Sequence, residues 1–341
     1  MKKPILLAVL PVCILITNLS VSTCDKPFDP ADSIDQTWET ASGTVTLIDA
    51  SPLYTIEYTA DYRFDDYLRT GSMPFAFAEH TDSARFSCTC FSAFGDGSRL
   101  LGRNYDWDDP SVTYLVFTDP PDGYASAATV DLSFFAYNAQ EAPDHSANEN
   151  TLRRLPYFPF DGMNERGVAV GMNALNSAVS PFDPSKVTIG ELQAIRLVLD
   201  YAASTDEAIG LFRQYNIRME NPPIHYLIAD SSGHSVIIEF VNGNMEVMHN
   251  PDPWQVTTNF IITNLSRPED ASCWRYRTAY NQLKLKNGLF AADDAKDLLQ
   301  AVSVTITRWS TVYDLTTGRL QIARGRYYET FHSFSVPWAA R

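Results

Sequence analysis

The alternation of apolar and polar positions predicts a chain built mainly from paired strands. Alternating runs flank the turn-forming Ala-Ser-Pro within residues 43–62, and others occur in GVAVGMNAL, VTTNFIITN and two hairpins, YLIADSSGHSVIIEFVNGNMEVM and STVYDLTTGRLQIA. Helical periodicity occurs in 190–215, where we expect two helices broken near 203–206 with a Ser or Thr cap, and in 292–303. Strand pairs and helices without a regular βαβ rhythm favour antiparallel sheets with helices packed outside them.

One predicted hairpin carries two cysteines one residue apart in an apolar strand. The runs FSCTCFSAF and RLLGRNYDW flank Gly-Asp-Gly-Ser, and Asp-Gly at the centre of a turn is a strong hairpin signal. Centring the turn there pairs Cys90 with Arg103 and Cys88 with Tyr105. Strand alternation then places both cysteines and Arg103 on one face. The same alternation points Asp106 away from Cys88, so we expect the strand to twist or end near Tyr105.

The first residues have the order of a bacterial secretory signal. Two lysines precede an apolar run over residues 5–19, which is interrupted by Pro11 and shorter than the ~20 residues that span a bilayer. Val-Ser-Thr-Cys at 21–24 fits loosely the box in which a cysteine, here Cys24, becomes the lipidated first residue of a lipoprotein. Plain signal-peptidase cleavage is the alternative. We therefore expect an exported protein, periplasmic or attached to the cell envelope as a lipoprotein.

Charge and cysteine count restrict the classes of function. The formal net charge is −15, and it becomes −17 without the signal, whose charged residues are two lysines. This charge repels nucleic acid and gives no polybasic attraction to anionic lipid, so membrane contact is expected only through a lipid anchor. Of five cysteines, Cys13 would leave with the signal and Cys24 would be lipidated. Three remain, so at least one exported thiol stays free and calls for a chemical role.

The run CTCFSAFGDGSRLLGRNYDW resembles the start of the mature chain in the choloylglycine hydrolase family, also called linear amide C-N hydrolases, which includes bile salt hydrolases and penicillin V acylases. The family's Cys-Thr and Gly-Arg-Asn-aromatic-Asp-aromatic pattern stands at Cys88-Thr89 and at 102–107. Further resemblances follow in order: DGMNERGVAVGMNAL, Thr258-Asn259-Phe260, Trp274-Arg275-Tyr276 and the run 307–314. The resemblance implies an N-terminal-nucleophile hydrolase of the α+β class, with antiparallel sheets in a four-layer αββα sandwich.

The resemblance also implies six catalytic residues: Cys88, Arg103, Asp106, Asn164, Asn259 and Arg275. Arg103 would favour the Cys88 thiolate by charge attraction, and Asp106 could orient the α-amino group or the arginine. The backbone N–H of Asn164 and the side-chain amide of Asn259 would stabilise the oxyanion, and the second arginine would complete the charge network. If Cys88 begins the processed chain, its amine, with an ordinary pKa of about 7.7–8.0, can act as general base.

Residues 25–87 stand between the signal and Cys88, so we expect the chain to cut itself. The thiol would attack the Ser87 carbonyl, an N-to-S acyl shift would give a thioester, and water would release the new amine. The expected organisation is a signal in 1–24, a tether and prosegment in 25–87, and a catalytic domain in 88–341. Cys90 is an alternative nucleophile, but the family pattern aligns from Cys88. Cys90 is better explained as a small buried apolar residue.

Two classes of function stay open at this point. The leading hypothesis is an exported amidase acting on a linear, non-peptide C–N amide with an apolar acyl part, in the manner of bile salt hydrolases or penicillin V acylases. No metal or cofactor is expected, because the histidines lack ligand spacing and no nucleotide-binding fingerprint occurs. The alternative is a surface lipoprotein that uses the fold for ligand binding. A homo-oligomer is compatible with the family, and the aromatic ends of 134–160 either anchor a loop in the core or form a wall of the acyl pocket.

Overall fold

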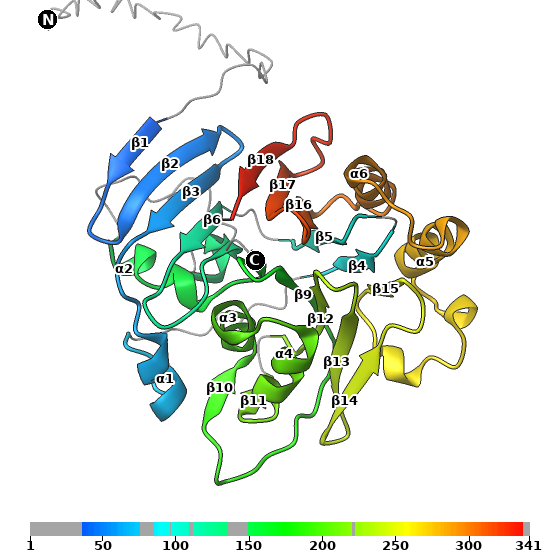
Figure 1. The fold of residues 1–341 in the computed structure, drawn as a ribbon, viewed down its shortest axis with the longest axis horizontal. Coiled ribbons are helices and arrows are strands. Elements are labelled where there is room, and N and C mark those ends of the chain that lie inside the picture. Colours follow the sequence, from blue (N-terminus) through cyan, green and yellow to red (C-terminus); the bar gives the residue numbers. More distant parts are fainter. Residues whose placement is uncertain are drawn as a thin grey trace, which may run out of the picture. The chain divides into compact units, whose positions relative to one another are not determined.

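Two β-sheets packed face to face form the body of the protein in the computed structural model (Figure 1), which describes residues 36–75, 85–95, 97–108, 112–135, 149–219 and 222–336. The larger sheet has ten strands in the order β1-β2-β3-β6-β7-β8-β9-β12-β13-β14, and the smaller has six in the order β15-β4-β5-β16-β17-β18. All described residues belong to one unit, Ser33–Arg341. The predicted signal and Cys24 lie outside the described residues, so these assignments stay predictions.

The ten-stranded sheet comprises β1 (Gln36–Glu39), β2 (Gly43–Asp49), β3 (Leu53–Tyr58), β6 (Thr113–Thr118), β7 (Ser126–Asp131), β8 (Asp161–Asn164), β9 (Val168–Ala174), β12 (Ile224–Asp230), β13 (Ser235–Val241) and β14 (Asn244–His249). The six-stranded sheet comprises β15 (Trp254–Thr257), β4 (Thr89–Ala93), β5 (Leu100–Asp106), β16 (Thr307–Asp314), β17 (Arg319–Arg324) and β18 (His332–Ser335). Strands β10 (Thr188–Gly190) and β11 (Asn216–Arg218) form a small parallel pair. In the two large sheets the pairing is antiparallel except between β3 and β6.

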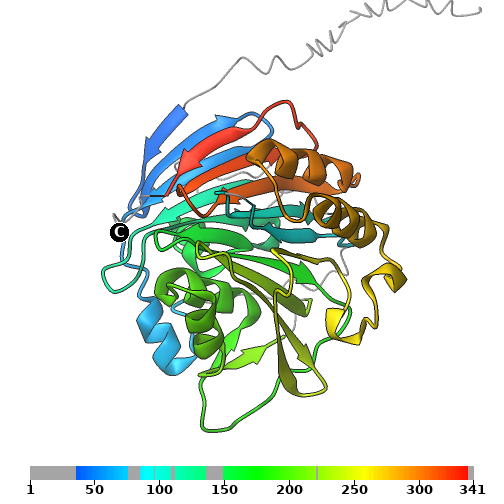
Figure 2. The same cartoon turned by 45° about the vertical axis from the view of Figure 1, so that its right-hand side comes forward.

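Helices cover the outer face of each large sheet (Figure 2). Helices α3 (Glu191–Tyr201) and α4 (Thr205–Phe212) pack on the ten-stranded sheet, and α5 (Trp274–Lys286) and α6 (Ala292–Ala301) pack on the six-stranded sheet. This arrangement confirms the αββα sandwich. The predicted break between the first two helices is confirmed as well, because the Ser204 hydroxyl accepts the Glu207 N–H at 3.2 Å and caps α4.

Shorter helical elements complete the described chain: α1 (Phe64–Thr70), α2 (Glu149–Leu152), and the 3₁₀ turns η1 (Leu132–Phe135), η2 (Leu155–Tyr157), η3 (Ile262–Asn264) and η4 (Pro268–Asp270). The turn η3 corrects one expectation, since VTTNFIITN was predicted as a single strand. Strand β15 ends at Thr257 instead. The Glu239 carboxylate accepts the N–H groups of Ile262 and Thr263 at 2.8 and 2.9 Å, so these groups do not pair with a neighbouring strand.

Two further elements differ from the sequence-based prediction. The run predicted as one hairpin forms three strands, because a second turn at Asn242 and Gly243, both with positive φ, separates β13 from β14. Helix α5 was not predicted as a helix. Its apolar stripe is narrow, with Tyr276, Ala279 and Leu283 buried among mostly polar neighbours, so the helical period is weak in the sequence.

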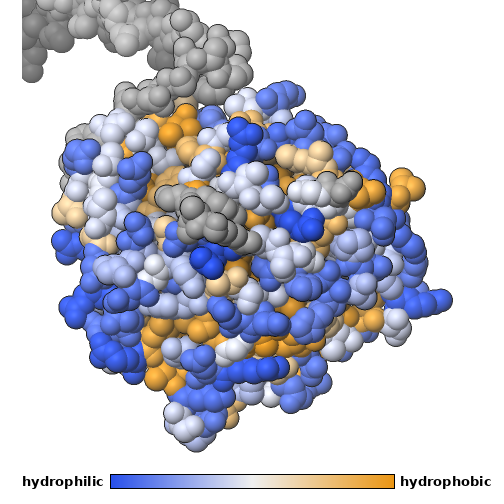
Figure 3. All heavy atoms as spheres, viewed as in Figure 1, coloured by the Kyte–Doolittle hydropathy of each residue, from blue (hydrophilic) through white to orange (hydrophobic). Residues whose placement is uncertain are grey.

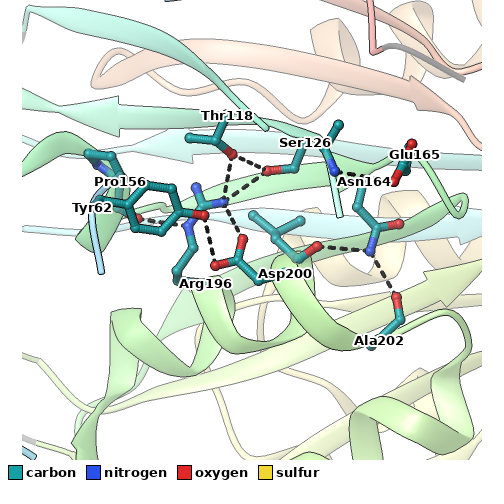
Figure 4. A network of polar contacts seen from close by, with 11 residues as sticks. Tyr62, Thr118, Ser126, Pro156, Asn164, Glu165, Arg196, Asp200 and Ala202 are labelled. Atoms are coloured by element: carbon teal, nitrogen blue, oxygen red, sulfur yellow. Dashed lines mark hydrogen bonds and ion pairs between the residues drawn. The ribbon is translucent and has the colours of Figure 1, made fainter. Parts of the chain in front are cut away.

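The chain before Cys88 is built into the ten-stranded sheet. Strands β2 and β3 form the hairpin expected from the alternating runs, and β3 then pairs with β6 in parallel over six residue pairs. The side chain of Tyr62 also enters the body, where its hydroxyl donates to Asp200 on α3 at 2.8 Å (Figure 4). The region 43–58 therefore contributes strands and core side chains to the folded unit.

The surface is mixed in polarity. On the face shown in Figure 3, apolar side chains occur in separate patches among polar ones. The large apolar side chains that are exposed among the described residues are Val179, Phe182, Trp274, Leu285, Leu289 and Tyr327. Within the same described ranges, none of the helices combines the length and the apolar character needed to cross a bilayer.

Candidate active site

The cysteine hairpin has the predicted register. Strands β4 and β5 pair Cys90 with Arg103 and Thr89 with Asn104, and the isolated bridge between Phe86 and Trp107 continues the same register past Cys88. Cys88 therefore lies just before β4, opposite Tyr105. This register is the one expected from the Asp-Gly signal in the sequence.

The backbone around Cys88 is fixed from both sides. The thiol is 1% exposed, and its Sγ lies 3.9 Å from the backbone oxygen of Asp106, which also accepts the Ser87 N–H at 3.2 Å. The Cys88 carbonyl oxygen accepts a hydrogen bond from Nη1 of Arg275. The Ser87–Cys88 peptide thus lies between the end of β5 and the first turn of α5, with the sulfur shielded from solvent in the intact chain.

Arg103 is fully buried, and two of its guanidinium nitrogens make no hydrogen bond within the described chain. Its Nη1 donates to the Phe160 carbonyl at 2.6 Å and pairs with Asp161, and its guanidinium carbon lies 5.2 Å from the Tyr105 ring centre. Nε and Nη2 have no hydrogen-bond partner among the described residues. Burial alone would lower the pKa of Arg103, but the charges of Asp161 and then Cys88 raise it above its usual range. A charged group with free donors can stabilise a thiolate nearby.

Asp106 carries another buried atom without a partner in the described chain. Its Oδ1 accepts the Thr307 hydroxyl at 2.5 Å, whereas the buried Oδ2 has no partner within the described chain. Burial raises the pKa of Asp106 to about 7, against the hydrogen bond from Thr307 and the charges of Arg275 and Arg103. As alternation predicts, the side chain leaves the face that Cys88 and Arg103 share. The backbone oxygen nevertheless keeps Asp106 beside the Ser87–Cys88 junction.

Arg275 connects the Cys88–Thr89 segment to the Asn259 amide. From the first turn of α5, its Nη1 donates to the Thr89 hydroxyl at 3.0 Å and its Nη2 to Oδ1 of Asn259 at 3.2 Å. This bond fixes the orientation of the Asn259 amide, whose Nδ2 then donates to the Ala174 carbonyl at 2.8 Å. An NH₂ group has two hydrogens, so the second remains for another acceptor.

Asn164 occupies a different place from the other predicted residues. Its side-chain Nδ2 donates to the carbonyls of Leu199 and Ala202 on the helix side of the sheet, at 3.0 and 2.8 Å (Figure 4). Its Oδ1 accepts the N–H groups of Arg166 and Val168 and so closes the turn between β8 and β9. The side chain is thus a structural support outside the group around Cys88. The role of its backbone N–H stays a prediction.

Asn173 is a site residue that the sequence reasoning missed. It lies on β9, fully buried, and its Oδ1 accepts the Thr257 hydroxyl at 2.6 Å, whereas its Nδ2 has no partner in the described chain. Gly171, two residues earlier on the same face, lies directly under Cys90. Asn173 therefore presents a free amide donor between the two sheets. The available clue was one asparagine within the otherwise apolar strand GVAVGMNAL.

Comparison with known proteins identifies the family of this chain. A family model described as linear amide C-N hydrolases, choloylglycine hydrolase family, matches residues 88–262, half of the chain, and the match starts at Cys88. The chain belongs to this family.

A penicillin V acylase of Pectobacterium atrosepticum is 32% identical over 176 residues, 47% of this chain and 45% of that protein. An uncharacterized protein of Paramecium bursaria Chlorella virus 1 is 29% identical over 102 residues, 27% of this chain and 37% of that protein. The matches thus span less than half the length of these curated relatives.

Solved structures agree on the fold. A mutant of the conjugated bile acid hydrolase from Clostridium perfringens superposes with a TM-score of 0.53 at 16% identity, covering 73% of this chain and 92% of that chain. Penicillin V acylase from Agrobacterium tumefaciens gives a TM-score of 0.50 at 18% identity, covering 72% and 85%. At these identities the likeness concerns the fold alone, and it confirms the αββα class.

Cys90 is packed beneath the Cys88 segment, between the two sheets. It is fully buried, and burial raises the pKa of its thiol well above the usual range. A Cβ added at Gly171 would lie 2.5 Å from its sulfur, so only glycine on β9 leaves room for the thiol. These contacts favour the interpretation of Cys90 as a core residue and not as the nucleophile.

Aromatic rings surround the strand opposite Cys88. Tyr105 stacks on Trp309 with ring centres 4.0 Å apart and meets Phe160 edge-on at 5.1 Å, and Phe134 meets Phe160 in turn at 5.6 Å. The aromatic ends of the 134–160 segment are therefore core residues that also border the site. Residues 136–148 lie outside the described chain. Within the described part, no cluster of three or more His, Cys, Asp or Glu residues is placed to bind a metal ion.

Proposed function

We propose that the protein is an exported amidase that hydrolyses a linear, non-peptide C–N amide through a thioester on Cys88. Family membership supports hydrolysis of this class of bond. The observation that carries the specific proposal is a set of open hydrogen-bonding positions on β5, which pairs with the Cys88 segment, and on the facing strand β9. These are the free edge of Arg103, Oδ2 of Asp106 and Nδ2 of Asn173, all buried and unpartnered in the described chain.

Activation would begin with a cut between Ser87 and Cys88. The Cys88 sulfur attacks the Ser87 carbonyl carbon, the peptide C–N bond breaks, and the nitrogen leaves as the α-amino group of Cys88. Water then hydrolyses the thioester, which releases a carboxylate on Ser87 and restores the thiol. Asp106 accepts the Ser87 N–H with its backbone oxygen, and its free carboxylate oxygen is available to the new ammonium group. The start of the family match at Cys88 supports this cut site.

Turnover would then use the same atoms on a substrate amide. The α-amine takes the thiol proton and the thiolate, favoured by Arg103, attacks the substrate carbonyl. The free N–H groups of Asn173 and Asn259 are suited to bind the oxyanion. The amine product leaves with the proton, and water hydrolyses the acyl thioester. The aromatic rings near Tyr105 suit an apolar acyl group, and conjugated bile acids and penicillin V, named for the relatives, are the first substrates to try.

Two measurements test this proposal. Intact-mass and N-terminal analysis of active protein should show a chain that starts at Cys88, and a panel of glycocholate, penicillin V and N-acyl amino acids should release amine with at least one member. Cys88→Ala should abolish both the cut and the hydrolysis, whereas Cys90→Ala should keep both. An active preparation that contains only uncut chain would contradict the N-terminal mechanism, and a working Cys88→Ala enzyme would contradict the choice of nucleophile.

Export and lipidation form a separate part of the proposal. They rest on the two lysines, the apolar run and the Val-Ser-Thr-Cys box at the N-terminus. Expression in a bacterium followed by fractionation should place wild-type protein in the cell envelope. Cys24→Ala should move it to the soluble exported fraction if Cys24 is lipidated, and should leave its location unchanged if a signal peptidase cuts the chain without lipidation.

A further inference from the structure

A row of three buried polar side chains crosses the ten-stranded sheet behind the site. Asn173 on β9 is the cross-strand partner of His225 on β12, and the β12–β13 register continues to place Glu239 opposite His225. The three strands lie side by side in Figure 1. All three side chains are fully buried. Because His225 and Glu239 take no part in the proposed chemistry, their burial needs another explanation.

Both ring nitrogens of His225 face acceptors. Nδ1 lies 2.7 Å from Oε1 of Glu239, and Nε2 lies 2.7 Å from the Thr258 carbonyl oxygen. The Glu239 carboxylate also accepts the N–H groups of Ile262 and Thr263 and the Thr263 hydroxyl, at 2.8, 2.9 and 2.7 Å. A carboxylate held by this many donors is fixed in position, and the two contacts of the ring tie it to Glu239 on one side and to the Thr258 backbone on the other. Burial would raise the pKa of Glu239, but the hydrogen bond and charge of His225 lower it below its usual range.

These contacts bracket Asn259. His225 binds the backbone one residue before it, and Glu239 binds the backbone three and four residues after it. We propose that His225 and Glu239 form a clamp that positions the Asn259 amide for the oxyanion, an inference that rests on the proposed function. Both are positioning residues, since neither reaches the reacting atoms in this arrangement.

The segment needs such a clamp because it leaves the sheet. Strand β15 ends at Thr257, and η3 begins at Ile262, so Asn259 lies between two regular elements. Arg275 and the Ala174 carbonyl orient the Asn259 side chain, but a side chain cannot be placed more accurately than its backbone. Misplacing a catalytic group by ~1 Å can cost about 100-fold in rate.

Glu239→Gln is the sharpest test because it keeps size and shape. It replaces one acceptor oxygen with an NH₂ group that would face N–H donors, so the segment should shift. We expect kcat, measured per processed chain, to fall about 10- to 100-fold while KM changes less than about threefold. His225→Gln, which can still donate to the Thr258 carbonyl, should lose less. Asp200→Asn is the matched control, since Asp200 belongs to a buried charge pair of α3.

Hydrogen exchange provides a readout that does not depend on activity. In the uncut Cys88→Ala chain, Glu239→Gln should speed exchange in peptides covering 258–264 at least about tenfold, whereas Asp200→Asn should not. If Glu239→Gln speeds exchange but the wild-type protein hydrolyses no amide, the clamp is supported and the proposed function is refuted. An active wild type would overturn the clamp if Glu239→Gln left exchange unchanged, or if it lowered kcat no more than Asp200→Asn.

Discussion

Two fully buried arginine–aspartate pairs lie on opposite sides of the ten-stranded sheet and differ in how completely they are satisfied. Asp200 accepts hydrogen bonds from Arg196 at 3.0 Å and from Tyr62 at 2.8 Å, and Arg196 also donates to the Pro156 carbonyl and to two hydroxyls, with Nη2 alone left over (Figure 4). In the pair of Arg103 and Asp161, the arginine uses one nitrogen and leaves two free.

The difference teaches how to separate support from chemistry. A buried polar group without a partner costs stability, so the network of Arg196, where only Nη2 of the arginine lacks a partner among the described residues, can be explained by its contribution to folding. We call it the closed network. The free nitrogens of Arg103, with the free oxygen of Asp106 and the free amide of Asn173, are not explained by folding. Arg103 and Asp106 lie on β5, which pairs with the Cys88 segment, and Asn173 lies on the facing strand β9, so these open positions suit the thiolate, ammonium and oxyanion of the proposed chemistry.

The two arginines should therefore respond differently to the same substitution. Arg103→Lys keeps a charge for Asp161 but removes the free edge of the guanidinium, so kcat/KM should fall about 100-fold or more. Arg196→Lys should leave kcat/KM within about threefold. Both variants should lower the free energy of unfolding by about 1–3 kcal/mol, because both lose buried hydrogen bonds. Steady-state kinetics with urea unfolding checks this, and equal losses of activity would remove the distinction.

Asp106, one of the groups without a full set of partners in the described chain, should make the stability of the protein depend on pH. Burial raises its pKa from 3.8 to about 7, so the folded uncut chain retains a proton that the unfolded chain loses. The free energy of unfolding should therefore fall as pH rises from about 4 to 7. We expect Asp106→Asn, made in the uncut Cys88→Ala chain, to reduce this pH-dependent decrease in the free energy of unfolding by at most about 2–4 kcal/mol. Urea unfolding at pH 4.5 and 7.5 measures it.

In the processed enzyme the new ammonium group of Cys88 should lower the pKa of Asp106, so the fall in stability with pH should be shallower than in the uncut chain. Asp106→Asn should also reduce kcat about 10- to 100-fold in any chain that is cut. A processed enzyme with the same pH dependence as the uncut Cys88→Ala chain would show that the amine does not reach Asp106.

The sequence predicted those parts of the structure that are determined by residues close together along the chain. The Asp-Gly dipeptide in the sequence predicts the register of Cys90 with Arg103, and a local pattern predicts the cap at Ser204. The parallel pairing of β3 with β6 joins residues about sixty positions apart, and no local pattern specifies it. Asn164 and Asn173 illustrate the same limit. Both are asparagines in or beside strands, and only packing shows that one side chain supports a helix and the other faces the second sheet.

Gly171 tests how tightly the open network is held. A Cβ at this position would lie 2.5 Å from the Cys90 sulfur and 3.3 Å from Cδ of Arg103, so Gly171→Ala should displace both. We expect a loss of about 1–3 kcal/mol in stability and about tenfold in kcat. Adding Cys90→Ala should restore much of both. Gly210→Ala on α4, where nothing lies within 4 Å, should be neutral or stabilising. Full activity in Gly171→Ala would show that Arg103 tolerates displacement.

The smallest expected effect comes from the closed network of Arg196 and Asp200, which helps to hold the segment before Cys88. After the cut, this segment should stay bound, because β3 pairs with β6 over six residues and Tyr62 donates to the buried Asp200. Tyr62→Phe removes one buried hydrogen bond, so we expect the fragment to dissociate at lower urea, equivalent to about 1–2 kcal/mol, with kcat within about twofold. Tyr327→Phe, at an exposed position, is the matched control. Size-exclusion chromatography with urea follows the fragment. Loss of the fragment from wild-type enzyme in native buffer would contradict this prediction. It would mean that the closed network cannot hold strands β1–β3 after the cut and that these strands serve only the uncut chain.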